Sequence, residues 1–262
     1  MLRKLMKYEL MATGRVFLPL FVALVILSFV NRLLSYLPAE TPQFIGMLVV
    51  VMLIIGIMAL VFILTLQRFR NNLLSNEGHL MMTLPVSTNK LILSKLFVAT
   101  IWVAASLFVV TLSILIMGLP RAGFTELAAL IGDYIKLWGL KPLHVTIYTI
   151  EAVFGFIISV FTGILMLYTC MSTSMLVDRR RGLFTFGAFI VISIIMQTLL
   201  ASALSVIDIL DIDVFFGNIF RGLTSFGQSQ LILLIWFVID AVVCVVFFTI
   251  TRFMLKNRLN LQ

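Results

Sequence analysis

Few residues in this sequence could carry out chemistry, and their spacing does not assemble a catalytic site. The chain has 262 residues, of which eleven are Asp or Glu, two are His and two are Cys. His79, His144, Cys170 and Cys244 lack the spacing of metal ligands. The hydrolase, metalloprotease and phosphate-loop motifs are absent from the sequence. We therefore expect no catalytic residue, no metal site and no cofactor-binding residue, so the chain is not expected to be an enzyme.

Two acidic residues lie inside strongly apolar segments and form a candidate intramembrane polar site. They are Glu151 and Asp240. An ionisable group within a bilayer is unfavourable, so it usually faces the interior of a helical bundle or a path filled with water. For Asp240 two interpretations stay open. It contacts a transported substrate, or it is protonated and hydrogen-bonds to a neighbouring helix.

The composition indicates which elements position these acids. Hydrophobic residues make up 62% of the chain and charged residues only 11%, whereas a soluble domain carries about 25% charged residues. This balance excludes a soluble enzyme and a disordered chain. We predict an all-α integral membrane protein, a single domain over residues 1–262, because six apolar stretches are long enough to cross a bilayer. They run over residues 17–36, 44–66, 96–119, 147–176, 183–207 and 230–251.

The positions of the basic residues predict how these spans are oriented. Most of the nineteen Lys and Arg residues fall on one side of the predicted topology, which by the positive-inside rule is the cytoplasmic side. Both termini are therefore expected in the cytoplasm of a multi-pass protein. The basic residues occur in short clusters between apolar runs, so we expect membrane lipids and no nucleic acid as partners. The opposite side holds Arg32, Arg121, Lys136, Lys141 and Arg221.

The N-terminal segment, residues 2–15, has the pattern of a basic amphipathic helix lying on the membrane surface. Arg3, Lys4 and Lys7 share one side of a helical wheel and would anchor the helix to anionic headgroups. Glu9 interrupts the pattern because it points along the apolar side. It is either an acid that extends to the surface or a buried partner of a cytoplasmic Arg or Lys.

Two connections on the predicted outer side carry further elements. Residues 120–146 show helical spacing of apolar residues, which predicts an amphipathic helix with Trp138 as its interfacial anchor and an end at Lys141-Pro142. Residues 208–229 combine three aspartates with aromatic residues and glycines. This mixture predicts short segments that dip partly into the membrane. A calcium site formed by the aspartates is a weaker alternative, because the spacing lacks the Gly and the final Glu of a calcium loop.

The connection over residues 67–95 contains a short apolar element between two helix breakers. Gly78 permits a sharp turn, Pro85 ends any preceding helix, and Ser87 or Thr88 can cap the next one. The apolar residues at this predicted cytoplasmic tip would be buried against lipid or against another protein. The element is therefore a simple interfacial turn or a docking surface for a partner. Its apolar residues are Leu80, Met81, Met82 and Leu84.

This layout resembles the membrane subunit of ATP-binding-cassette exporters of the type-2 superfamily, over essentially the whole chain. That family has an amphipathic connecting helix before the first of six spans, a cytoplasmic coupling helix between spans two and three, and short outer re-entrant helices between spans five and six. Residues 2–15, 67–95 and 208–229 correspond to these features. The closest local similarity is Glu77-Gly78-x-Leu80-x-x-x-Leu84-Pro85. The basic residues that the family often places between the Glu and the Gly are missing here.

The resemblance implies a mechanism and a set of partners. Two permease subunits, identical or related, would pair in a bacterial cell membrane, and a cytoplasmic ATPase dimer would bind ATP and Mg²⁺. ATP-driven closure of that dimer would push on the coupling element and switch the transmembrane path. The residues implied to contact the ATPase are Glu77, Gly78, Leu80, Met81, Leu84 and Pro85.

Three points stay open at the level of sequence. Arg179, Arg180 and Arg181 would add a second ATPase contact, or they only set the topology. The cargo is not readable, although the apolar spans suit an amphipathic peptide, an antibiotic or a lipid-like substrate. The alternative functions are a stand-alone secondary carrier or channel, and a membrane assembly protein that does not transport.

Overall fold

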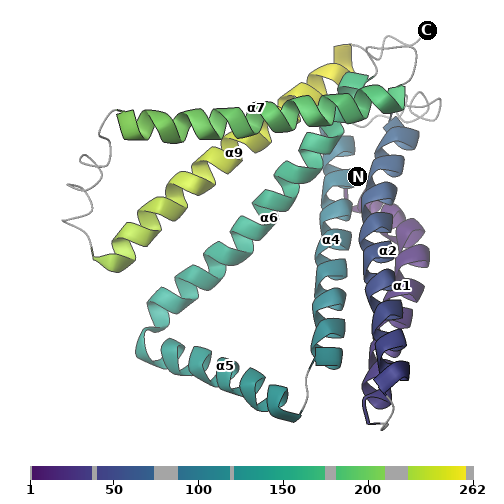
Figure 1. Cartoon of the computed structure of the whole chain (residues 1–262). Helices are drawn as coiled ribbons and strands as arrows, with labels where there is room; N and C mark the ends of the chain where they lie inside the picture. Colours follow the sequence, from purple (N-terminus) through teal and green to yellow (C-terminus); the bar gives the residue numbers. More distant parts are fainter. Residues whose placement is uncertain are drawn as a thin grey trace. The chain divides into compact units, whose positions relative to one another are not determined.

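The described part of the chain is helical throughout. The computed structural model describes residues 2–36, 40–73, 88–118, 121–174, 181–209 and 224–257. The chain divides into two compact units, Met1–Tyr148 and Thr149–Gln262. The helices in these ranges, labelled in Figure 1, are α1 (Leu2–Leu34), α2 (Glu40–Leu73), α4 (Thr88–Gly118), α5 (Arg121–Leu140), α6 (Pro142–Thr173), α7 (Arg181–Ile209) and α9 (Ser225–Asn257).

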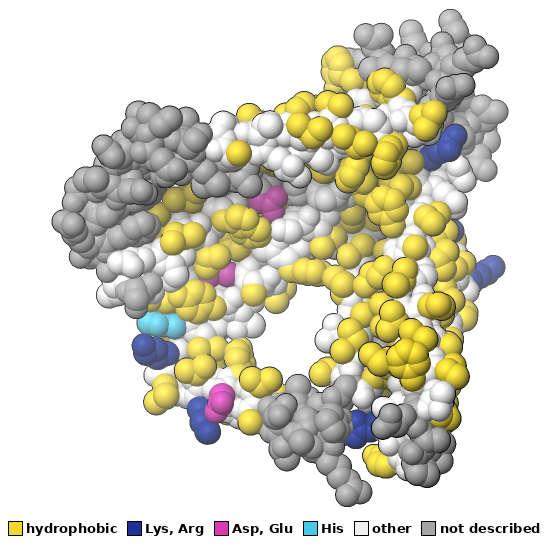
Figure 2. Space-filling view, viewed as in Figure 1, with side chains coloured by type: hydrophobic (Ala, Val, Ile, Leu, Met, Phe, Trp, Pro, Cys, Tyr) yellow, Lys and Arg dark blue, Asp and Glu magenta, His cyan; other side chains and the backbone are white. Residues whose placement is uncertain are grey.

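Six of these helices, all except α5, are long and apolar enough to cross a membrane. Each contains most or all of one predicted span, and most continue beyond it at one or both ends. Large apolar side chains cover much of the outer surface of the helices, as Figure 2 shows. In α7 no residue from Gly182 to Leu199 is buried. Such a surface is unfavourable in water and favourable in lipid. The chain is therefore a helical membrane protein with six candidate spans, as predicted.

The N-terminal segment differs from the prediction of a separate surface helix. α1 is one uninterrupted helix from Leu2 to Leu34, with Pro19 inside it. The residues between the basic segment and the span contain no breaker, and a proline within a helix removes only one backbone hydrogen bond. Thirty-three residues extend about 50 Å, which exceeds the roughly 30 Å of a bilayer core. The amphipathic segment is thus a continuation of the first span.

The first unit has a core formed by α1, α2 and α4, which lie side by side. Trp102 of α4 packs on two phenylalanines of α1, with ring centroids 4.7 Å from Phe17 and 6.0 Å from Phe21. Its indole Nε1 donates a hydrogen bond of 2.6 Å to the hydroxyl of Thr13, so the polar atom of this large side chain is satisfied. The other buried members of the core are Leu24, Val50, Ile57, Val61, Val98 and Val110.

The predicted helix on the 120–146 connection is confirmed as α5. It ends at Leu140, and α6 begins at Pro142, the position where a missing N–H costs a helix nothing. Trp138 near the end of α5 donates a 3.0 Å hydrogen bond from Nε1 to Thr146 Oγ1 in the first turns of α6. The corner between the two helices is therefore fixed by a side-chain bond. An anchoring role of Trp138 in the headgroup layer stays a prediction.

In the second unit α6 and α9 run in the same direction. Three pairs of side chains join them, from residue 151 to 230, from 159 to 240 and from 169 to 251, with sequence offsets of 79, 81 and 82. A nearly constant offset requires parallel helices, which Figure 1 also shows. Gly155 leaves room for two aromatic rings of α9, because a Cβ atom there would lie 3.0 Å from the Trp236 ring and 3.1 Å from the Phe237 ring.

The parallel register predicts a specific crosslink. The hydroxyl oxygens of Thr169 and Thr251 lie 3.0 Å apart, so two cysteine side chains at these positions would face each other across the helices, as a disulfide requires. We expect Thr169→Cys with Thr251→Cys to crosslink on oxidation in membranes, in a background where Cys170 and Cys244 are alanine. A protease site inserted between residues 210 and 223 would let a non-reducing gel detect the bond.

The matched control pairs Thr169→Cys with Thr249→Cys, because Thr249 is exposed and bonds only to its own helix. Equal crosslinking of the two pairs, or none for the first pair, would contradict the parallel register.

Candidate functional site

The described residues contain one buried ionic cluster, centred on Glu9. Lys95 Nζ donates a hydrogen bond to Glu9 Oε1, and Arg68 Nη1 lies 3.5 Å from Glu9 Oε2. The side chain of Lys95 is only 4% exposed, that of Glu9 13% and that of Arg68 32%. Of the two interpretations that the sequence left open for Glu9, the structure confirms the buried partner of basic residues.

The cluster joins three helices at one end of the first unit. Glu9 lies in the N-terminal third of α1, Arg68 near the C-terminal end of α2, and Lys95 in the second turn of α4. One helical turn beyond Glu9, Thr13 donates a 2.8 Å hydrogen bond to the Glu9 carbonyl and accepts one from Trp102. Ionic and neutral hydrogen bonds therefore hold α1 against α4 at neighbouring levels. A buried charge of this kind is stable only while its partner remains in place.

The apolar side of the N-terminal segment faces the protein. Arg3, Lys4 and Lys7 are exposed, as the amphipathic pattern predicts. Met6 and Leu10 pack against the core formed by α1, α2 and α4, whereas the amphipathic pattern predicts that this side lies on lipid. The physical reason is that a helix satisfies its apolar side equally well on a protein core, and α4 offers one. Headgroup anchoring by the three basic residues stays a prediction.

The residues implied to contact an ATPase lie outside the described part of the chain. This holds for the whole set from Glu77 to Pro85 and for Arg179 and Arg180; Arg181 is the first residue of α7, and its side chain is not described. The structure does describe the flanks of the first set, since α2 ends at Leu73 and α4 begins at Thr88. The ionic cluster therefore includes residues from both helices that border this segment.

The candidate polar site at Glu151 and Asp240 is two separate pairs. Gln230 Nε2 of α9 donates a 3.0 Å hydrogen bond to Glu151 Oε2 of α6. Ser159 Oγ of α6 donates a 3.3 Å hydrogen bond to Asp240 Oδ2 of α9. The two pairs are separated by eight residues of α6, or about 12 Å of helix. The acids do not meet, but they share one line of polar contacts between the helices.

This line, which we call the α6–α9 polar seam, comprises three rungs: Glu151 with Gln230, Ser159 with Asp240, and Thr169 with Thr251. Neither acid belongs to an ion pair in the described residues. Sequence reasoning missed Ser159, Gln230, Thr169 and Thr251. Only the pairing of α6 with α9 at an offset of about eighty residues distinguishes them, and hydropathy does not contain that information.

Within the described ranges, no three His, Cys, Asp or Glu side chains lie together as a metal site would require. Cys170 and Cys244 are both free thiols. Comparison of the chain with known proteins gives no match to a family model, a curated protein or a solved structure. The site evidence is therefore the ionic cluster and the polar seam.

We expect the buried charge pair to contribute much more to the free energy of unfolding than an exposed pair does. We expect Glu9→Gln to lower the free energy of unfolding by about 3–5 kcal/mol, because Lys95 then remains buried without an anion. Replacing the pair by Glu9→Leu with Lys95→Met should recover most of this loss. Chemical unfolding in detergent micelles measures both.

The exposed pair of Lys136 and Asp133, whose side chains are 77% and 66% exposed, is the control. Lys136→Ala should change stability by less than about 0.5 kcal/mol. A Glu9→Gln variant as stable as this control would show that the buried pair has no structural role.

Proposed function

We propose that this chain is the membrane subunit of an ATP-driven exporter of the ATP-binding-cassette class, moved by a separate cytoplasmic ATPase. The observation that supports the proposal best is the ionic cluster of Glu9, Arg68 and Lys95. It ties α1 to the two helices that border residues 74–87, the segment that carries the resemblance to a coupling element.

The proposed coupling follows from the position of this cluster. Arg68 precedes the end of α2 at Leu73 by five residues, and Lys95 follows the start of α4 at Thr88 by seven residues. A push on the segment between them reaches both helices within about two turns. Separating Glu9 from Lys95 would leave charges buried without a partner, which costs several kcal/mol. α1 is therefore expected to move together with α4 when the ATPase closes.

The division of labour with the partners follows from the residues available. The ATPase dimer supplies ATP binding and hydrolysis with Mg²⁺, and this chain supplies the coupling element and half of the transmembrane path. A second permease subunit, identical or related, supplies the other half. In this proposal the N-terminus, the C-terminus and residues 74–87 are cytoplasmic, in agreement with the positive-inside rule.

The α6–α9 polar seam is the part of the chain best suited to an amphipathic cargo. It presents two acids without an ionic partner in the described residues, between helices whose remaining surface is apolar. A cargo with an apolar body and a polar or cationic group would satisfy both surfaces. An amphipathic peptide, an antibiotic or a lipid-like molecule fits this description better than a sugar.

Co-purification distinguishes this proposal from a stand-alone carrier or channel. A solitary carrier needs no soluble partner. If the chain were one, affinity purification of the full chain from its own membranes would return it alone. We expect it to bring down a soluble ATPase in equimolar amount, with ATP hydrolysis stimulated by an amphipathic cargo. A complex whose hydrolysis no cargo stimulates would favour a membrane assembly protein.

The proposed coupling role predicts the phenotype of a double variant. Glu77→Ala with Leu80→Ala should lower ATP-dependent accumulation of a fluorescent amphipathic peptide in inside-out vesicles about tenfold or more. The expected reason is that the ATPase no longer drives the spans, so hydrolysis by the complex continues and the membrane level of the chain is unchanged.

Asn76→Ala, in the same connection, serves as the control and should retain transport. Unchanged transport in the double variant would remove the role assigned to residues 77–84.

A further inference from the structure

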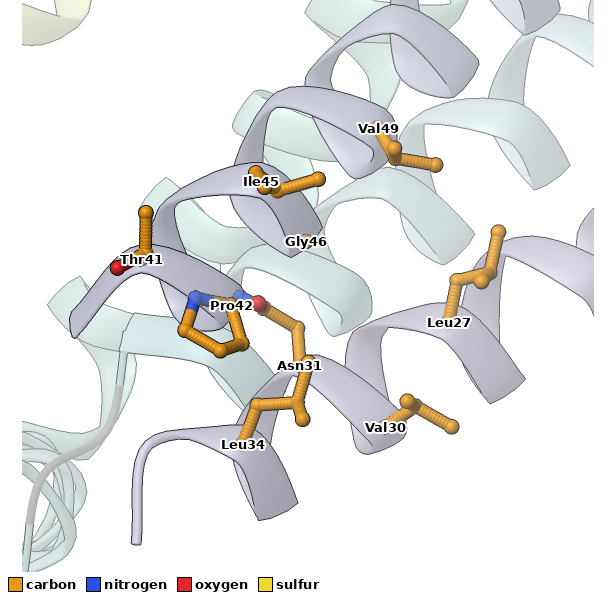
Figure 3. A pocket seen from close by; sticks show the side chains of 9 residues that line it. All are labelled: Leu27, Val30, Asn31, Leu34, Thr41, Pro42, Ile45, Gly46 and Val49. Carbon is orange, nitrogen blue, oxygen red and sulfur yellow. The ribbon is translucent and has the colours of Figure 1, made fainter. Parts of the chain in front are cut away.

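A cavity of about 440 Å³ lies between α1 and α2, where α1 ends and α2 begins. Figure 3 shows the side chains that line it. Its volume falls within the usual range of small-molecule sites, about 300–1,000 Å³. Val30, Ile45 and Val49 in its wall are exposed large apolar residues. The cavity therefore opens sideways, toward the lipid that surrounds the helices.

The cavity contains one buried polar group that the protein does not satisfy. Asn31 of α1 is only 5% exposed, it lines the cavity, and its side-chain oxygen Oδ1 has no hydrogen-bond partner among the residues that the structure describes. An unsatisfied buried acceptor costs about 1–3 kcal/mol. This cost is tolerated where a ligand supplies the missing donor.

Gly46 of α2 explains how Asn31 fits at this position. A Cβ atom on Gly46 would collide with Asn31 Oδ1, so only glycine lets the amide lie against the backbone of α2. The terminal torsion of an asparagine is broad and roughly two-fold. A half-turn about it would exchange the amide oxygen and nitrogen, and would turn the acceptor away from Gly46 toward a bound molecule.

The walls define the chemistry of the ligand. The described residues that line the cavity include no Lys, Arg, Asp or Glu, so an ionised headgroup would lose its hydration without gaining a counter-ion from them. The walls are apolar apart from Asn31 and Thr41. A ligand that matches has a long hydrocarbon chain and a neutral hydrogen-bond donor next to it. The lateral opening indicates that the ligand comes from the bilayer.

We propose that this cavity binds an uncharged long-chain lipid alcohol of the diacylglycerol type, whose chain packs on the apolar walls and whose hydroxyl donates a hydrogen bond to Asn31. Asn31 lies three residues before the end of α1 at Leu34, about one helical turn. In the predicted topology this is the outer end of the first span, where the first polar atoms of a lipid would meet its hydrocarbon chains. The site does not depend on the proposed transport function.

The test uses the full chain reconstituted in phosphatidylcholine vesicles with a photoactivatable dioleoylglycerol. After irradiation, mass spectrometry should locate adducts on residues 27–49. Unlabelled dioleoylglycerol should compete about fivefold better than its methyl ether, which keeps the shape and lacks the donor; a hydrogen bond of about 1 kcal/mol corresponds to this ratio.

Two variants identify the groups responsible. Asn31→Leu should abolish the preference for the alcohol over the ether, so that both compete equally. Ile45→Trp, which fills the cavity and keeps Asn31, should abolish labelling of residues 27–49. Val51→Trp is the matched control, because Val51 is exposed on the same helix but does not line the cavity, and it should label as the parent chain does.

Three outcomes would overturn the proposal. The first is equal competition by the alcohol and its ether in the parent chain. The second is competition by phosphatidylcholine as strong as that of the alcohol, which would indicate that ordinary phospholipid fills the cavity. The third is an adduct or crosslink between two copies of the chain at these residues, which would make the cavity a protein interface.

Discussion

The constraint on which the structure depends is that polar groups at membrane depth must be satisfied within the protein. Helices satisfy their own backbone groups. Many hydroxyl side chains inside them do the same, since Ser28, Thr100 and Ser106 each donate to the carbonyl four residues earlier. The hydroxyls of Ser113 and Ser172 are exceptions, because they are buried without a partner among the described residues. Polar groups that cannot be satisfied in this way reach another helix, as Trp102 does through Thr13. The candidate sites are therefore the places where helices exchange hydrogen bonds, together with the unsatisfied amide oxygen of Asn31, which lines a cavity.

The two units meet this constraint by different means. In the first unit an aromatic and aliphatic core holds α1, α2 and α4, and polar contacts such as the buried ionic cluster add to it. In the second unit the helices α6 and α9 are joined by the rungs of the polar seam and by the packing of two aromatic rings of α9 at Gly155. Lipid chains are as apolar as leucine, so packing of small residues and hydrogen bonds hold such helices together. The seam is for this reason a structural contact, and in the proposed function it is also the polar surface available to a cargo.

Features that depend on an average over many residues, such as the membrane spans, can be predicted from the sequence. The partner of a single side chain cannot. Six spans follow from hydropathy, because each needs about twenty apolar residues and tolerates local exceptions. The continuity of α1 does not follow, since an amphipathic segment is equally stable on lipid and on the α4 face. Glu9 signals a buried acid, but only the fold selects Lys95 and Arg68 from nineteen basic residues. Ser159 and Gln230 carry no signal at all until α6 and α9 are known to be parallel.

The two cations of the ionic cluster do not contribute equally to a mechanical link. Lys95 is almost fully buried and hydrogen-bonded to Glu9, whereas Arg68 is about one-third exposed and 3.5 Å away. A partly exposed cation can exchange its carboxylate for water at small cost, but a buried one cannot. The contact between α1 and α4 is therefore the fixed link of the first unit, and the contact with α2 is the exchangeable one. Any motion driven from residues 74–87 would separate α2 from the pair of α1 and α4 before it separates that pair.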